Sequence, residues 1–287
     1  MPSERRKKFS RSSVAPRLVL QHRDIALLRD VAEFRFLNTP QILALHTGGE
    51  RNLMRRLSAL YQHGYLDRPE VQKAARLSSA HMVYSLGRKA AEVLSKDRPE
   101  RDTILRRVRE VKHTSPIIAH AMMISQFHVC LTLALKKRPV VKLTRWTQGN
   151  DLKLVLSARG RKPELVPDAF FTLDDGNGAV NFFLEADRAT ETTERFVRKL
   201  KIYWSWKDDA KTMDALGITR FRVLTVAHSE GRAESLCAAA KNADPQKRGS
   251  LMFLFASESL YGVGNPDPIL EAAWKTPKDD LLHAAIE

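Results

Sequence analysis

The chain has 287 residues, of which 43% are hydrophobic and 28% are charged, a composition typical of a folded protein and unlike that of a disordered one. Its 48 Lys and Arg residues against 33 Asp and Glu residues give a net charge of +15, which favours a polyanionic partner. We find no apolar run of about 18 residues and no secretory signal, so the sequence predicts a cytoplasmic protein without a membrane segment.

The positive charge is concentrated in the N-terminal third of the chain. Residues 1–112 contain 24 Lys and Arg against 12 Asp and Glu, a net charge of +12 that leaves +3 for the remainder. The basic residues do not line one face of a helix opposite a broad apolar face, as a membrane-surface anchor would require. We therefore expect nucleic acid rather than a membrane as the partner. Residues 1–19 predict a flexible basic arm, which is either a solvated tail or a DNA contact.

Residues 20–96 carry the pattern of a small helical module. Apolar residues recur every three or four positions from Arg23 to about Leu37, and Asn38 with Pro40 starts a second short helix. A Gly-containing turn precedes a third helix over residues 50–63. Two short strands, residues 65–68 and 81–86, then flank a basic loop, and a helix over residues 87–96 follows. This order is typical of a winged helix-turn-helix domain.

The third helix and the loop supply the candidate DNA contacts. Arg and Asn side chains on a helix in the major groove can reach guanine and adenine edges, whereas basic loop residues meet phosphates. The candidate DNA-binding residues are Arg51, Asn52, Arg55, Arg56, Lys73 and Arg76. The alternative is an ordinary solvated helix face on a module that contacts protein. We expect binding to double-stranded DNA, and a homodimer because helix-turn-helix proteins often bind paired half-sites.

A charged linker over residues 97–114 and a second domain over residues 115–262 are predicted next. The predicted elements of this domain are an apolar helix at 117–135, strands at 140–146, 152–156, 168–173 and 181–186, a helix at 192–208, a strand at 221–226, a helix at 231–242 and a strand at 251–256. Residues 174–178 predict a hairpin turn. Residues 263–287 are expected to form a loosely packed tail. Cys130 and Cys237 are interpreted as buried thiols, too few for a disulfide framework.

Three acidic residues stand at the ends of two predicted strands. Asp168 begins one strand, and Glu185 and Asp187 end the next. Because the strands flanking the turn are of similar length, an antiparallel hairpin brings Asp168 close to Glu185. Asp168 and Glu185 are therefore candidate Mg²⁺ ligands, since this ion prefers hard oxygen donors. Equally, the carboxylates can hold the following helix in place by pairing with Arg188, Arg195 or Lys199.

These motifs resemble a known fold and a known family. Pro167 and Asp168, followed by Glu185, Ala186 and Asp187 in an α-β-β-β-α-β order, are similar to the PD-(D/E)XK nuclease fold. Over residues 20–260 the chain resembles the replication-relaxation family of plasmid and mobile-element proteins, on the winged helix, His120, the motif at 167–169, and the run at 184–191 that leads to Lys199 and Tyr203.

The resemblance implies an α+β chain in which an N-terminal winged helix-turn-helix is followed by an α/β PD-(D/E)XK nuclease-like domain. It also implies a role in replication, transfer or transcriptional control of a plasmid or mobile element. His120 lies on an apolar helix, where we interpret it as a core histidine rather than a ligand.

The chain departs from the nuclease pattern at the position two residues after Glu185, where Asp187 replaces the expected lysine. Lys199 or Lys201 on the next helix is the candidate replacement, and the candidate catalytic set is Asp168, Glu185, Asp187 and Lys199. Three functions remain open: a DNA-binding regulator, a Mg²⁺-dependent endonuclease targeted by its winged helix, and a structural adaptor that binds an acidic protein.

Overall fold

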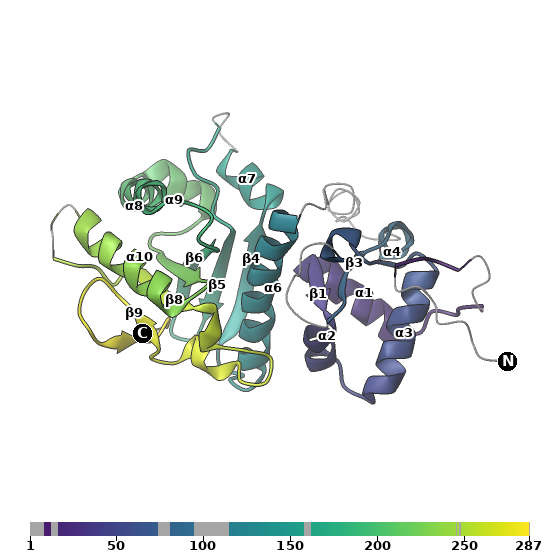
Figure 1. Cartoon of the computed structure of the whole chain (residues 1–287). Coiled ribbons are helices and arrows are strands. Elements are labelled where there is room, and N and C mark those ends of the chain that lie inside the picture. Colours follow the sequence, from purple (N-terminus) through teal and green to yellow (C-terminus); the bar gives the residue numbers. More distant parts are fainter. Residues whose placement is uncertain are drawn as a thin grey trace. The chain divides into compact units, whose positions relative to one another are not determined.

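The computed structural model describes residues 9–12, 17–73, 81–94, 115–157, 162–244, 246 and 248–286. The chain divides into two compact units, residues 1–129 and 130–287, and the division falls within one long helix. The predicted linker at 97–114 lies outside the described residues. The described part combines helices with two separate sheets, in agreement with the predicted mixed α and β character (Figure 1).

The N-terminal unit combines short helices with a small antiparallel sheet (Figure 1). Its sheet has the strand order β1-β3-β2. The described elements, in chain order, are α1 (His22–Phe34), β1 (Phe36–Asn38), α2 (Thr39–Leu45), α3 (Glu50–Gln62), β2 (Leu66–Asp67), the 3-10 helix η1 (Glu70–Lys73), β3 (Val83–Leu86), α4 (Arg88–Leu94) and the first part of α6 (Ser115–Lys136).

Local signals explain where α1 ends and where α2 begins. Asn38 caps α2, since its side chain accepts from the Gln41 N–H at 3.0 Å while the Gln41 side chain accepts from the Asn38 N–H at 2.8 Å. The sequence placed residues 36 and 37 at the end of the first helix, and this is wrong. Arg35 has a φ of +68°, which ends the helix, and β1 follows it. Phe36 and Leu37 are both buried, a pattern that periodicity alone does not distinguish from a helix.

The beginning of α6 completes the core of the N-terminal unit. Ile118 packs against Phe36 and Val83. The Ser125 hydroxyl donates to the Phe34 carbonyl at 2.7 Å, and the His128 ring centroid lies 4.4 Å from that of Phe34. These buried polar groups are therefore held by specific contacts with α1.

One helix among the described residues is long and apolar enough to cross a membrane, namely residues 116–136 within α6. The expectation of no apolar run of this length is therefore corrected. Half of the most apolar window is buried inside the protein, and the core helix of a folded domain has the same length and composition. The buried Ser125 and His128 side chains agree with a core helix.

The C-terminal unit is built on a seven-stranded mixed sheet with the order β10-β9-β8-β7-β6-β5-β4 (Figure 1). Strands β6, β7 and β8 are parallel, and the other neighbouring pairs are antiparallel. The described elements are β4 (Lys142–Gln148), α7 (Asn150–Leu156), β5 (Ala169–Asp174), β6 (Ala179–Asp187), α8 (Thr193–Lys207), α9 (Ala210–Leu216), β7 (Arg222–Ala227), α10 (Glu230–Ala243), β8 (Phe253–Ser257), the 3-10 helices η2 (Glu258–Leu260) and η3 (Asp267–Leu270), β9 (Trp274–Lys275) and β10 (Leu282–His283).

The core of this unit lies between the sheet and helices α8, α9 and α10. Alternate residues of the strands point to these helices, so that Phe170, Phe183 and Phe253 meet Leu200 and Tyr203. The opposite face of the strands is buried as well, which explains their nearly continuous apolar character. Because β6, β7 and β8 are parallel, their carboxyl ends meet at one edge of the sheet, as they do where open α/β sheets bind ligands.

Two further expectations about this unit are wrong. Residues 152–156, predicted as a strand, belong to helix α7, because Gly149 with a φ of +60° turns the chain at the end of β4. The predicted loose tail, residues 263–287, instead supplies β9 and β10. Trp274 is completely buried and its indole N–H donates to the Ile269 carbonyl at 3.2 Å, so apolar residues within the tail anchor it.

Candidate functional site

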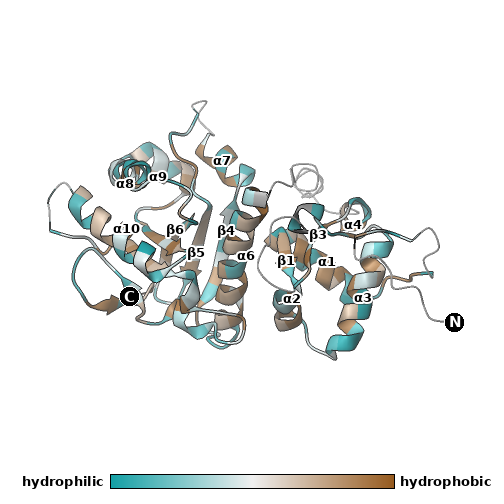
Figure 2. Ribbon diagram, viewed as in Figure 1, coloured by the Kyte–Doolittle hydropathy of each residue, from teal (hydrophilic) through white to brown (hydrophobic). Residues whose placement is uncertain are grey.

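The exposed start of α3 carries three of the predicted DNA contacts. Arg51, Asn52 and Arg55 are exposed, and their side chains make no hydrogen bond or ion pair within the described part of the chain. Leu53 and Leu57 from the same helix are completely buried. Figure 2 shows the resulting mixture of hydrophilic and hydrophobic residues along α3. The helix therefore presents cationic and amide groups to solvent on a firmly packed backbone.

Arg56 has a different environment from its neighbour Arg55. Its guanidinium forms a bidentate pair with Asp24 of α1, in which Nε donates to Oδ1 at 2.9 Å and Nη2 contacts Oδ2. Nη2 also donates to the Val19 carbonyl at 3.1 Å. Asp24 is only 1% exposed. Arg56 is a predicted base contact, and in the structure its guanidinium pairs with a buried carboxylate that joins α3 to α1.

The turn between α2 and α3 has a specific geometry. Gly48 has a φ of +111°, which favours glycine, and the Arg23 guanidinium donates to the Thr47 carbonyl at 2.6 Å. A Cβ atom on Gly48 would lie 3.1 Å from that guanidinium. The turn between α2 and α3 is thus held by a glycine in a left-handed conformation and by Arg23 of α1.

The side chains of the two predicted loop contacts, Lys73 and Arg76, lie outside the described residues. Lys73 ends η1, whereas no part of Arg76 is described. The strands on either side of this loop, β2 and β3, are paired as a hairpin. In that hairpin the Gln72 side chain holds both the N–H and the carbonyl of Val83.

The predicted basic arm is attached to α3 at the residues that are described. Arg11 donates to the Tyr61 carbonyl at 3.0 Å and lies over the Tyr61 ring, 5.1 Å from its centroid. The Ser12 N–H donates to the Gln62 side chain at 2.6 Å. The arm at residues 10–12 is thus anchored to the C-terminal end of α3. Residues 1–8 and 13–16 lie outside the described residues.

In the C-terminal unit, the predicted hairpin of β5 and β6 brings Asp168 beside Glu185. The Asp168 N–H donates to the Leu184 carbonyl at 3.1 Å, and Asp168 Oδ2 accepts from the Ala186 N–H at 2.8 Å. In the sheet, Glu185 pairs with Thr225 of β7. Both carboxylates therefore lie at the edge where the parallel strands end.

Glu185 is buried, and both of its oxygens have protein partners. Oε2 lies 2.9 Å from Nζ of Lys199, and Oε1 accepts from the Tyr203 hydroxyl at 2.5 Å. Burial raises the pKa of Glu185 to about 7, and the facing Lys199 ammonium opposes that rise. Burial also acts to lower the pKa of Lys199, but Glu185 and Glu191 outweigh it and raise that pKa. The ammonium therefore stays charged at neutral pH.

Asp187 forms a separate buried ion pair. Its two oxygens accept from Nε and Nη2 of Arg232, each at 2.9 Å, and Asp187 is 5% exposed. Arg232 also donates to the Thr193 hydroxyl at 3.2 Å and to the Glu191 carbonyl at 3.0 Å. This geometry is bidentate and joins α10 to β6 and to the start of α8. Asp187, a candidate catalytic residue in the sequence, is thus occupied by an arginine.

These carboxylates do not fit a divalent metal ion. Mg²⁺ needs several oxygen ligands with open lone pairs, and the protein itself occupies both oxygens of Glu185 and of Asp187. No three His, Cys, Asp or Glu side chains in the described ranges are grouped so that they could hold a metal. Asp168 and Glu185 lie close together, as predicted. The cation that contacts Glu185 is the ammonium of Lys199, at 2.9 Å, rather than a metal ion.

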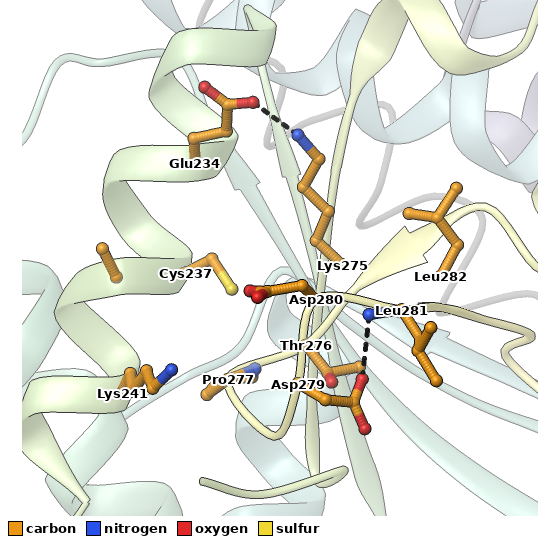
Figure 3. A pocket seen from close by; sticks show the side chains of 11 residues that line it. Glu234, Cys237, Lys241, Lys275, Thr276, Pro277, Asp279, Asp280, Leu281 and Leu282 are labelled. Carbon is orange, nitrogen blue, oxygen red and sulfur yellow. Dashed lines mark hydrogen bonds and ion pairs between the residues drawn. The ribbon is translucent and has the colours of Figure 1, made fainter.

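A pocket of about 420 Å³ lies elsewhere in this unit, between α10 and the segment that contains β9 and β10 (Figure 3). Cys237, predicted to be a buried thiol, lines this pocket and is only half-buried, whereas Cys130 is fully buried. Lys275 crosses toward α10 and pairs with Glu234 at 2.5 Å. The pocket mixes both charge signs and shares no residue with the carboxylate cluster.

Arg232 was not among the residues predicted from the sequence, and Tyr203 had no predicted role beyond the family pattern. Arg232 follows the helix cap Ser229 by three residues, which places it in the first turn of α10 directly after the parallel strand β7. That position, at the carboxyl edge of a parallel sheet, is the signal that could have identified it. The parallel order of β6 and β7 had to be known first.

Comparison with known proteins gives one family. A family model described as replication-relaxation matches residues 28–230, more than two thirds of the 287-residue chain. No curated protein and no solved structure matches the chain. The matched range includes α3 and the cluster around Glu185, which are the two features described above. The chain belongs to the replication-relaxation family.

Proposed function

We propose that the chain is a cytoplasmic protein that binds double-stranded DNA and acts in replication, transfer or transcriptional control of a plasmid or mobile element. Residues 20–96 are proposed to form a winged helix-turn-helix, in which α3 enters the major groove and the β2–β3 hairpin is the wing. The order of α1, α2, α3 and the hairpin supports this proposal.

One observation carries the proposal: the exposed face of α3 offers Arg51, Asn52 and Arg55, whose side chains have no partner among the residues that the structure describes. This helix lies in residues 1–112, which carry a net charge of +12. Guanidinium groups can donate two hydrogen bonds to guanine, and a carboxamide can pair with adenine. Lys73 and Arg76 are proposed phosphate contacts on the wing.

The C-terminal unit is proposed to be a PD-(D/E)XK-like scaffold used for homodimerisation or for handling DNA. The hairpin of β5 and β6, followed by α8 and the parallel strand β7, supports the likeness. Its carboxylates are paired with Lys199 and Arg232, which favours a scaffold over a metal-dependent endonuclease. An adaptor for an acidic protein is the remaining alternative, and a DNA-binding measurement separates the two.

The test is fluorescence anisotropy of the purified full chain with a labelled duplex selected from a random pool. Counterion release predicts that log K falls with log salt by about 0.9 for each phosphate contacted, so affinity drops steeply between about 50 and 200 mM salt. The double variant R51A/R55A is compared with R195A/R198A on the exposed face of α8, which removes the same charge.

We expect R51A/R55A to lose selectivity for the selected duplex, and R195A/R198A to retain it. A salt-independent interaction, or equal effects of the two double variants, would rule out recognition through α3.

A further inference from the structure

One apolar side chain stands on the exposed face of α3. Met54 is 38% exposed, whereas Leu53, Leu57 and Leu60 of the same helix are completely buried. All residues of α3 are described, and among them Met54 is the one large hydrophobic residue that is exposed. Met54 therefore lies on the solvent side of the helix rather than in the core.

Met54 lies among the candidate base contacts. It follows Arg51 by three residues, and Arg55 follows Arg51 by four, so the three side chains share one face of the helix. Both arginines are exposed, and their side chains have no partner among the residues that the structure describes. The methionine is thus an apolar group between two cations on the face proposed to meet DNA.

The major-groove edges of the four bases offer one apolar group. Guanine presents two acceptors, adenine an acceptor and a donor, and cytosine a donor, whereas thymine presents an acceptor and its C5 methyl group. A guanidinium serves the guanine acceptors, but a thioether is only a weak acceptor and is suited to apolar contact. An apolar side chain on a helix in the major groove therefore favours thymine over the other three bases.

We propose that Met54 packs against the C5 methyl group of a thymine in the target duplex and selects for that base beside the bases that Arg51 and Arg55 contact. This inference rests on the proposed function, because it requires α3 to lie in the major groove. The flanking guanidinium groups and the net charge of +12 on residues 1–112 favour duplex DNA as the partner of this face. Apolar patches that mark protein interfaces are larger, on the order of a few hundred Å² or more, than a single methionine among cations.

The experiment measures anisotropy of the purified full chain with the selected duplex, in which each thymine in turn is replaced by deoxyuridine. This replacement removes the C5 methyl group and leaves the base pairing and the major-groove acceptor unchanged. Burial of one methyl group contributes about fourfold to affinity. The wild type should therefore bind about fourfold more weakly when one particular thymine is replaced.

M54A should bind the unmodified duplex more weakly, and replacement of that thymine should weaken its binding no further. M54L keeps an apolar side chain and should retain the preference for thymine, whereas M54Q keeps the length but not the apolar character and should lose it. R55A is the matched control on the same face: it should bind more weakly overall and keep the fourfold difference between thymine and deoxyuridine. Circular dichroism verifies that each variant is folded.

Equal losses of the wild type and M54A at every thymine would overturn the proposal, and so would a selected duplex in which no replacement of thymine weakens wild-type binding. An M54A variant that binds DNA normally but alters self-association in sedimentation would also overturn it, because Met54 would then contact protein. Binding that depends on Arg51 and Arg55 but not on Met54 would leave the proposed function standing. Failure of every duplex to bind would refute both.

Discussion

Arg55 and Arg56 are adjacent on α3, yet the structure predicts opposite consequences when each is replaced by alanine. Arg55 is exposed and has no side-chain partner among the described residues, whereas Arg56 holds the buried Asp24 through two hydrogen bonds. R55A should therefore change DNA affinity and leave folding intact. R56A should weaken folding and leave the affinity of the folded protein largely unchanged.

The expected magnitudes follow from these environments. Losing one bidentate base contact costs about 1–3 kcal/mol, so R55A should bind the selected duplex about 5- to 150-fold more weakly. R56A leaves Asp24, 1% exposed, as an uncompensated buried charge, for which losses of about 3–5 kcal/mol are typical. Because the Arg56 side chain is itself 20% exposed, water moderates the pair, and we expect about 2–3 kcal/mol.

Both variants are measured by urea unfolding followed by circular dichroism and by anisotropy titration with the selected duplex. R55A should keep the wild-type free energy of unfolding within about 0.5 kcal/mol. The D24N variant serves as a control, since it disrupts the same pair from α1 without touching the α3 surface. If R56A retained full stability and lost as much affinity as R55A, the assignment of Arg56 to a structural pair would be wrong.

Three further predictions concern stability. His128 is 1% exposed, and burial lowers its pKa to about 3, so between pH 6.5 and 3 the unfolded chain binds a proton that the native protein does not. The contribution of His128 to stability should therefore fall by about 2 kcal/mol from pH 7 to 5, while the raised pKa of Glu185 acts in the opposite direction. In pH-resolved urea unfolding, H128F should remove the His128 contribution, so that the stability of the variant relative to wild type rises as the pH falls. A slope unaffected by H128F would refute this. R232A should lower the free energy of unfolding by about 3–5 kcal/mol, because it leaves the buried Asp187 carboxylate without its charge partner. R232K should recover only part of this loss, because a lysine cannot form the bidentate pair. Equal stability of wild type, R232A and R232K would contradict the pairing. W274A should lower the free energy of unfolding by about 3–5 kcal/mol in the same assay, because Trp274 is completely buried. A loss below about 1 kcal/mol would mean that residues 263–287 are a loosely packed tail after all.

The elements of the N-terminal unit were largely predictable because their signals are local. Asn38 and Pro40 mark the start of α2, and the spacing of Leu53, Leu57 and Leu60 identifies the buried face of α3. The role of Arg56 was not predictable in this way. Periodicity places it on the polar side of α3, but its partner Asp24 lies 32 residues earlier, and only the packing of α1 on α3 brings them together.

In the C-terminal unit, the hairpin signal at 174–178 correctly brought Asp168 to Glu185. The pairing of Lys199 with Glu185 was one of the alternatives drawn from the sequence, and it is confirmed. The Asp187–Arg232 pair was missed, because it depends on the parallel pairing of β6 with β7 and on the helix that follows. Non-local sheet topology, rather than residue type, limited the prediction of the site.

The central proposal, DNA binding without metal-dependent cleavage, is tested most directly by incubating the protein with supercoiled and linear DNA in EDTA, Mg²⁺ or Mn²⁺ and scoring binding and cleavage together. D168A and E185A variants belong in the same experiment. We predict equal binding in all three conditions and intact DNA throughout. Cleavage that requires Mg²⁺ or Mn²⁺ and disappears in both variants would contradict this prediction and identify an endonuclease, and absence of binding would refute the DNA-binding function itself.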